Sequence, residues 1–174
     1  MWYRKGDGFV NIRPIENADL LEVQRVAQVT WLHAYKEIYP EKAILTFLSQ
    51  AYSLDRLRDL LRTDSNKLRR LFYVVATEDG IVGYGELVER GFAEYELTRI
   101  YLLPEFQGKG IGKRLLNQLI NDVYPLRQMF AWVEKENGGG RSFYESMQFH
   151  VEEEIEDNFF GTVTHLLKYV REWE

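Results

Sequence analysis

The chain has 174 residues, of which 45% are hydrophobic and 28% charged, and its formal net charge is −5. This length suits one domain with one core, so residues 1–174 are predicted to form a single domain, and the absence of cysteine excludes disulfides, thiolate metal sites and a cysteine nucleophile. The acidic balance argues against a nucleic-acid partner, and the lack of a secretory segment or of an apolar run of ~20 residues predicts a cytoplasmic protein without a membrane partner.

The first half of the chain reads as one strand, three helices and a meander. A strand is expected over 9–14, and the helix that follows has apolar or buried-type residues at helical spacing: Leu20, Val23, Ala27, Thr30, Trp31 and Ala34. Pro40 and Ser53 are typical starting residues for a second and a third helix. Three β-rich runs at 71–77, 81–89 and 94–103 are separated by turn residues, which predicts a meander of three strands.

In the second half of the chain the expected elements alternate between helices and strands. Pro104 cannot donate to a ladder and ends the third strand of the meander. A helix is expected over 110–124, a strand over 129–133, a short helix over 142–147 that starts at Ser142, and two strands over 149–155 and 162–169. Because a crossover helix joins parallel strands, the strands before and after the first of these helices are predicted to be parallel, and the sheet is predicted to be mixed.

A glycine-rich turn between a buried strand and an amphipathic helix carries the strongest chemical signal. Gly108, Gly110 and Gly112 allow backbone N–H groups to converge without interference from Cβ atoms. The N-terminus of a helix favours an anion, and Lys109, Lys113 and Arg114 add positive charge. The turn is therefore predicted to hold a pyrophosphate.

Two familiar phosphate motifs do not fit this turn. A P-loop needs Ser or Thr after Gly-Lys, but Gly112-Lys113 is followed by Arg114. The dinucleotide fingerprint Gly-x-Gly-x-x-Gly does not match the spacing of the three glycines. A tight strand-to-helix turn without a ligand remains the alternative on these residues alone.

Two motifs together resemble those of the GNAT superfamily of N-acetyltransferases. Gln107–Gly112 (QGKGIG) matches the pattern Gln/Arg-x-x-Gly-x-Gly/Ala, and Asn137–Phe149 resembles Asn-x-x-Ala-x-x-Phe-Tyr-x-x-x-Gly-Phe. Gly140 and Gln148 depart from the second pattern, and Gln148 is expected to need a positive φ at a helix end. The region 31–40 and the overall layout loosely resemble bacterial PaiA-type polyamine acetyltransferases.

The resemblance implies an α/β (α+β) fold with a mixed, mostly antiparallel sheet of six to seven strands and helices on both faces. It also implies direct transfer of an acetyl group from acetyl-CoA to an amine, with no metal. The scattered histidines likewise argue against a metal site. An acyl-CoA-binding regulatory module without turnover and a protein or peptide N-acetyltransferase remain alternatives. The oligomeric state is open, with a homodimer among the alternatives.

The resemblance also assigns roles to residues. The backbone of Ile100, Tyr101 and Leu102 should pair with the pantetheine arm, in an opening between this strand and that of Ala131, and Leu102 or a neighbour should bind the oxyanion. The other expected cofactor contacts are Gln107, Gly108, Lys109, Gly110, Ile111, Gly112, Lys113 and Asn137. Tyr144 matches the tyrosine that protonates the departing thiolate, and Glu96 matches a general base.

The chemistry supports a need for a base. With a pKa of ~10.4, only about one alkyl amine in a thousand is neutral near pH 7.4, so the acceptor must lose a proton. Glu96 is the candidate, and Glu94 on the same strand face and water are the alternatives. Trp31, Tyr35 and Tyr39 cluster in one helical region, and Trp31 and Tyr35 are predicted to contact a small polycationic acceptor such as a polyamine, whose methylene stem and charge suit aromatic faces.

Overall fold

The computed structural model describes residues 3–4, 9–62 and 69–174. In chain order the elements are β1 (Tyr3–Arg4), β2 (Phe9–Pro14), α1 (Leu20–Tyr35), α2 (Glu41–Ala51), α3 (Leu54–Leu61), β3 (Arg70–Thr77), β4 (Gly80–Gly91), β5 (Glu94–Leu102), α4 (Ile111–Asn121), β6 (Gln128–Glu134), α5 (Gly138–Ser146), β7 (His150–Phe159) and β8 (Thr162–Glu172). Short 3₁₀ turns precede α1 and follow β5.

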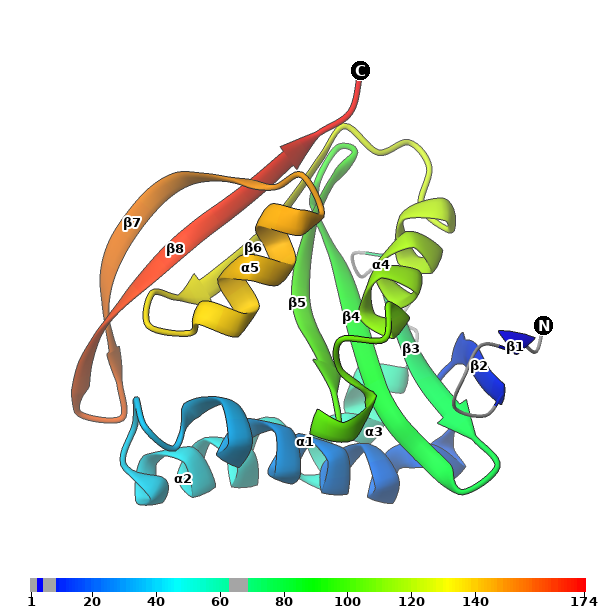
Figure 1. The fold of residues 1–174 in the computed structure, drawn as a ribbon, viewed down its shortest axis with the longest axis horizontal. Helices are drawn as coiled ribbons and strands as arrows, with labels where there is room; N and C mark the ends of the chain where they lie inside the picture. Colours follow the sequence, from blue (N-terminus) through cyan, green and yellow to red (C-terminus); the bar gives the residue numbers. More distant parts are fainter. Residues whose placement is uncertain (1–2, 5–8, 63–68) are drawn as a thin grey trace.

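All eight described strands lie in one sheet, in the order β1-β2-β3-β4-β5-β6-β8-β7. β5 and β6 are parallel, and every other neighbouring pair is antiparallel. The predicted mixed, mostly antiparallel sheet is therefore confirmed, and the two-residue β1 adds an eighth strand to the seven expected runs. β8 pairs with β6 over Leu166–Glu172, and Figure 1 shows the turn of the β7–β8 hairpin near α2.

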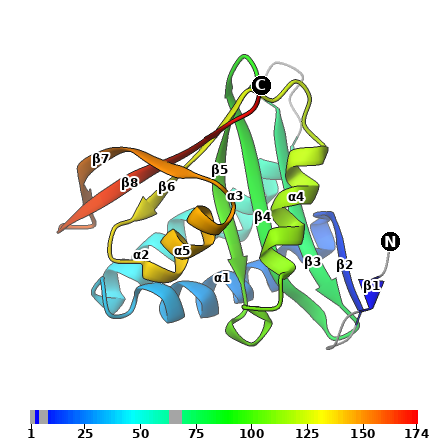
Figure 2. The same ribbon diagram turned by 45° about the horizontal axis from the view of Figure 1, so that its top comes forward.

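Helices cover both faces of the sheet, as expected. On one face α1 packs against β4 and β5, and Tyr84 of β4 contacts the Tyr52 ring that follows α2. On the opposite face a Cβ at Gly85, the next residue, would meet Leu115 and Leu119 of α4. Figure 2 shows α4 and α5 on the same side of the sheet, with α1 and α2 running below it. No helix of the described residues is long and apolar enough to cross a membrane, and the cytoplasmic location stays a prediction.

Several boundaries differ from the sequence-based expectation. The helix expected to start at Ser142 starts at Gly138, so Ser142 lies inside α5 rather than at its beginning. The reason is a cap: Asn137 Oδ1 accepts a hydrogen bond from the Gly140 backbone N–H at 3.0 Å, which offsets the weak helix propensity of three glycines. α4 ends at Asn121, short of the expected 124, and β7 continues to Phe159, beyond the expected 155.

Candidate active site

The centre of the sheet splits where its two parallel strands diverge. β5 and β6 pair only over Glu94–Glu96 with Gln128–Phe130. Beyond Glu96, β5 keeps its partner β4 on one side, while β6 continues beside β8. The backbone edges of β5 and β6 therefore face an opening, at the place where the sequence predicted a cofactor entrance.

A cavity of about 780 Å³ occupies this opening. Its walls come from the second half of α1, from Leu97–Leu102 of β5, from the glycine-rich turn, from the end of β6 and from α5. Most of the predicted site residues line it: Tyr35, Ile100, Tyr101, Leu102, Gln107, Gly108, Gly110, Gly112, Lys113, Asn137 and Tyr144. Four predicted residues are not part of its wall: Trp31, Glu96, Lys109 and Ile111.

The glycine-rich turn has the geometry of an anion site. Gly108 and Gly110 have φ values of +70° and +77°, and a Cβ at either position would meet no atom within 4 Å. Gly110 directly precedes α4, so unpaired N–H groups of the first turn of α4 lie beside the cavity. The Gln107 side-chain amide donates to the Leu102 carbonyl at 2.9 Å, which fixes the turn to the end of β5. This arrangement suits a pyrophosphate.

A small hydroxyl and amide network joins three walls of the cavity. Asn137 caps α5 through Oδ1, and its Nδ2 donates to the Tyr35 hydroxyl at 3.4 Å. The Tyr35 and Tyr101 hydroxyls lie 3.4 Å apart. Burial raises the pKa of both phenols, so they stay neutral at physiological pH. Asn137 thus connects α5 with α1 and, through Tyr35, with β5.

Tyr144 of α5 presents a phenol to the cavity. Its ring is 7% exposed and stacks on Tyr169 of β8, with 5.6 Å between the ring centroids. Among the described residues, its hydroxyl has no hydrogen-bond partner. Burial, together with the nearby Tyr35 and Glu96, raises the pKa of Tyr144 well above its ordinary value. The phenol therefore remains protonated at neutral pH and can serve as a proton donor.

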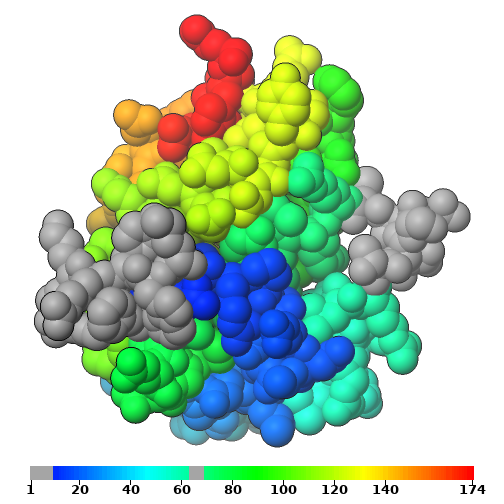
Figure 3. Space-filling model, turned by 90° about the vertical axis from the view of Figure 1, so that its right-hand side faces the viewer, coloured from blue at the N-terminus to red at the C-terminus, as the bar shows by residue number. Residues whose placement is uncertain are grey.

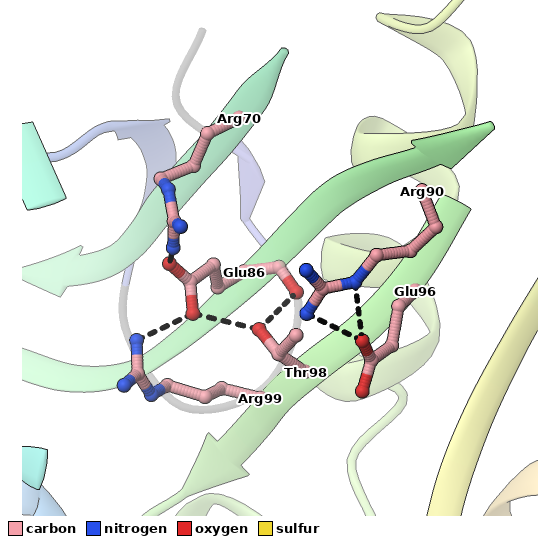
Figure 4. Close-up of polar contacts among 6 residues, drawn as sticks. All are labelled: Arg70, Glu86, Arg90, Glu96, Thr98 and Arg99. Carbon is pink, nitrogen blue, oxygen red and sulfur yellow. Dashed lines mark hydrogen bonds and ion pairs between the residues drawn. The ribbon is translucent and has the colours of Figure 1, made fainter. Parts of the chain in front are cut away.

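Glu96 lies at the closed end of the opening, in the last residue pair of β5 and β6. Its Oε2 accepts from Arg90 Nε and lies 2.6 Å from Arg90 Nη2 as well, and the side chain is 19% exposed (Figure 4). The alternative base, Glu94, lines a different surface hollow together with Arg127 and Trp173. The structure thus brings neither carboxylate into the cavity wall, and the role of Glu96 stays a prediction.

A buried ionic cluster beside the cavity was not predicted from the sequence. Glu86 of β4 is 1% exposed and contacts Arg70, Thr98 and Arg99, of which Thr98 and Arg99 also line the cavity (Figure 4). The sequence feature that could have indicated this cluster is the carboxylate of Glu86, which lies within the otherwise apolar run 81–88.

An aromatic cluster lies next to the α1 side of the cavity. It consists of Trp31, Tyr35, Tyr39, Phe47 and Phe159, whose closest ring centroids are 4.1 Å apart. The Tyr39 hydroxyl donates to Glu134 at 2.8 Å, and Thr164 also contacts this carboxylate. Glu134 is 4% exposed, and no ion pair with it occurs within 9–62 and 69–174. The same described ranges contain no group of His, Cys, Asp and Glu that could hold a metal ion.

Comparisons with known proteins agree with this geometry. The family described as "Acetyltransferase (GNAT) domain" matches residues 69–151. A spermidine N(1)-acetyltransferase of Thermoplasma acidophilum is 32% identical over 147 residues, which cover 83% of this chain and 90% of that protein. The crystal structure of PaiA N-acetyltransferase from Thermoplasma acidophilum in complex with coenzyme A is 29% identical, with a TM-score of 0.78 over 94% of this chain and 99% of that one.

A third comparison shows the shared fold. The spermidine N-acetyltransferase from Vibrio cholerae, solved in complex with CoA and spermine, has a TM-score of 0.69 at 22% identity and covers 94% of this chain and 95% of that one. The Thermoplasma structure contains coenzyme A, and the opening and the glycine-rich turn of this chain suit that group. The chain belongs to the GNAT family and is an acetyl-CoA-dependent N-acetyltransferase, which transfers an acetyl group to an amine.

Proposed function

We propose that the acceptor is a small polycationic amine of the polyamine class. The observation that carries this proposal is the aromatic cluster, which includes the cavity-lining Tyr35 and whose Tyr39 donates to the buried carboxylate of Glu134. A buried carboxylate without a cation is costly unless a charge is supplied to it. A distal ammonium group would supply that charge, and the rings would cover the methylene stem. The Thermoplasma relative named for spermidine supports the same class.

Each site residue has a separate role in the proposed acetyl transfer. The backbone of Ile100–Leu102 binds the pantetheine arm, and an N–H group of Leu102 or a neighbour stabilises the oxyanion that forms when the acceptor nitrogen attacks the thioester carbonyl. Gln107–Lys113 hold the pyrophosphate. Tyr144 donates a proton to the sulfur when the C–S bond breaks. The acceptor proton leaves to Glu96 or to water, and a second ammonium nearby helps by lowering the pKa of the reacting amine.

An assay of acceptors tests the proposal. We expect kcat/KM for spermidine to exceed that for a monoamine of equal length with a neutral tail. Added salt should lower kcat/KM for spermidine more, because exposed charges are screened over ~8 Å at physiological ionic strength. If the neutral-tailed amine reacts equally fast, the proposal of a polyamine acceptor is wrong, and a peptide or amino-acid amine becomes the next candidate acceptor. Binding of CoA without turnover of any amine would favour the regulatory module.

A variant of Glu134 tests the residue itself. Glu134→Gln keeps a group that can accept from Tyr39 and Thr164 but removes the charge. We expect kcat/KM for spermidine to fall about tenfold, as for one lost charge-assisted contact, while the monoamine is unaffected. Glu156→Gln removes the same charge from an exposed position of β7 and is the matched control. Equal losses for both amines, or for both variants, would contradict the role of Glu134.

A further inference from the structure

β5 carries an irregularity at the head of the opening. Glu86 of β4 pairs with Arg99, and the next residue, Leu87, pairs with Leu97, so Thr98 is an extra residue of β5. The last pair between β5 and β6 involves Glu96, two residues earlier. A bulge leaves its extra residue unpaired and re-aims the backbone. The bulge therefore sets the direction in which the cavity-lining backbone leaves the sheet.

Glu86 holds this bulge from the neighbouring strand. The Thr98 hydroxyl donates to Glu86 Oε2 at 2.6 Å, and the Arg99 guanidinium donates to the same oxygen. Arg70 of β3 donates to Oε1 (Figure 4). The Arg99 guanidinium also lies 5.0 Å from the centroid of the Tyr52 ring, which limits its freedom further. One carboxylate thus contacts both residues of β5 at the irregularity.

We propose that Glu86 is a positioning residue for acetyl transfer. An apolar residue could fill a buried strand position at equal or lower cost in stability, so stability alone does not explain a carboxylate that two guanidinium groups must satisfy. Glu86 instead fixes Thr98 and Arg99, and through them the start of the cavity-lining backbone that continues into Ile100–Leu102, the segment proposed to bind the pantetheine arm and the oxyanion. A displacement of about 1 Å at a reacting centre lowers the rate by ~10²-fold. This role concerns the transfer itself and does not depend on which amine is the acceptor.

The test separates the transfer step from cofactor binding. Glu86→Gln removes the charge, and Thr98→Val replaces the hydroxyl with a methyl group. For each variant we expect kcat to fall by ~10- to 100-fold. The Kd of CoA, measured by calorimetry, should stay within about twofold, because its phosphate contacts lie on the turn after β5. If both residues act through the same bulge, the loss in the double variant should be smaller than the product of the single losses.

A matched control distinguishes positioning from a general loss of stability. Asp19, at the start of α1, is a buried carboxylate with a two-point contact to Arg13 at 2.7 and 2.8 Å. Asp19 lies at the N-terminal end of α1, which together with β2 forms the blue part of Figure 3. The cavity is lined by the other, second half of α1. Asp19→Asn makes the same chemical change, and we expect a lower Tm with unchanged kcat.

Three results would overturn the proposal. They are wild-type kcat in Glu86→Gln, equal fold losses of kcat and CoA affinity, and single-variant losses that multiply in the double variant. If Glu86→Gln does not fold, Thr98→Val decides alone: wild-type kcat overturns the proposal, and a selective loss of kcat supports it.

Discussion

Replacement of Tyr144 by phenylalanine separates catalysis from stability. The ring of Tyr144 is buried and stacks on Tyr169, while its hydroxyl has no hydrogen-bond partner among the described residues. Tyr144→Phe keeps the ring contacts and breaks no hydrogen bond with any residue of the described ranges. We therefore expect the free energy of unfolding to change by less than about 0.5 kcal/mol.

The catalytic effect should be far larger. If Tyr144 protonates the leaving thiolate, its loss should lower kcat by about 10²-fold, which corresponds to ~2.7 kcal/mol in the barrier. The affinity for CoA should change little, because Tyr144→Phe leaves the glycine-rich turn that suits the pyrophosphate unchanged. The chain contains no cysteine, so a thiol reagent added to the assay reports only the CoA that the reaction releases.

Tyr169 provides the matched control. Its hydroxyl donates to Glu145 at 2.8 Å and is contacted by Arg141 Nε at 3.3 Å. Tyr169→Phe removes the same atom from the partner ring of the stack, and we expect about 1 kcal/mol lower stability with unchanged kcat. Wild-type turnover in Tyr144→Phe under conditions where chemistry limits the rate, or equal losses of kcat in both variants, would refute the reasoning.

Three further results are expected. Because burial raises the pKa of Tyr144, activity that needs the protonated phenol should be lost only above pH 10, and a basic limb with a midpoint near 9 in kcat that disappears in Tyr144→Phe would contradict this. Gly110→Glu should weaken CoA binding at least tenfold in calorimetry through its charge, whereas Gly161→Glu, also at a positive φ, should not. Gly139→Ala should raise Tm by removing a helical glycine, but Gly140→Ala should not, because its Cβ would lie 2.8 Å from Asn137 Nδ2.

Local patterns were sufficient for most of the fold. Each predicted strand and helix has a counterpart, because alternation and helical spacing reflect which side of an element is buried. The glycine-rich turn was located by the same kind of reasoning, and in the structure Gly108 and Gly110 have positive φ values. Gln148 also has a positive φ, of 67°. The sequence predicted this, because Gln148 occupies a position at which the family pattern has glycine.

The start of α5 shows where local reasoning is insufficient. Three consecutive glycines are poor helix formers, so the sequence favoured a later start. One cap hydrogen bond from Asn137 and the close packing of Gly140 against Val133 and Asn137 outweigh that propensity. The same packing accounts for glycine in place of the alanine of the family pattern, because in this conformation the Asn137 side chain occupies the space that a Cβ would need.

The ionic contacts of β5 could not be predicted, because they depend on register. Glu86 lies opposite Arg99 in the ladder and also contacts Thr98, the extra residue of β5. Nothing in the alternation of β5 indicates where that residue is inserted. The bulge also shows why the position of Glu96 was uncertain. Alternation assigns a face only within a regular strand, and Glu96 precedes the bulge whereas the central cavity-lining residues follow it.

Glu96 can act as a base only through a route that its position allows. It does not line the cavity, and Arg90 holds its Oε2, so we expect water to carry the acceptor proton to Glu96. Glu96→Gln should then lower kcat/KM strongly at pH 7, where the amine is almost entirely protonated, and only weakly at pH 9.5, where a substantial fraction is already neutral. The raised pKa of Tyr144 keeps the proton donor intact over this range. A variant impaired equally at both pH values would show that Glu96 serves the structure of the β4–β5 hairpin through Arg90 and not the removal of the proton.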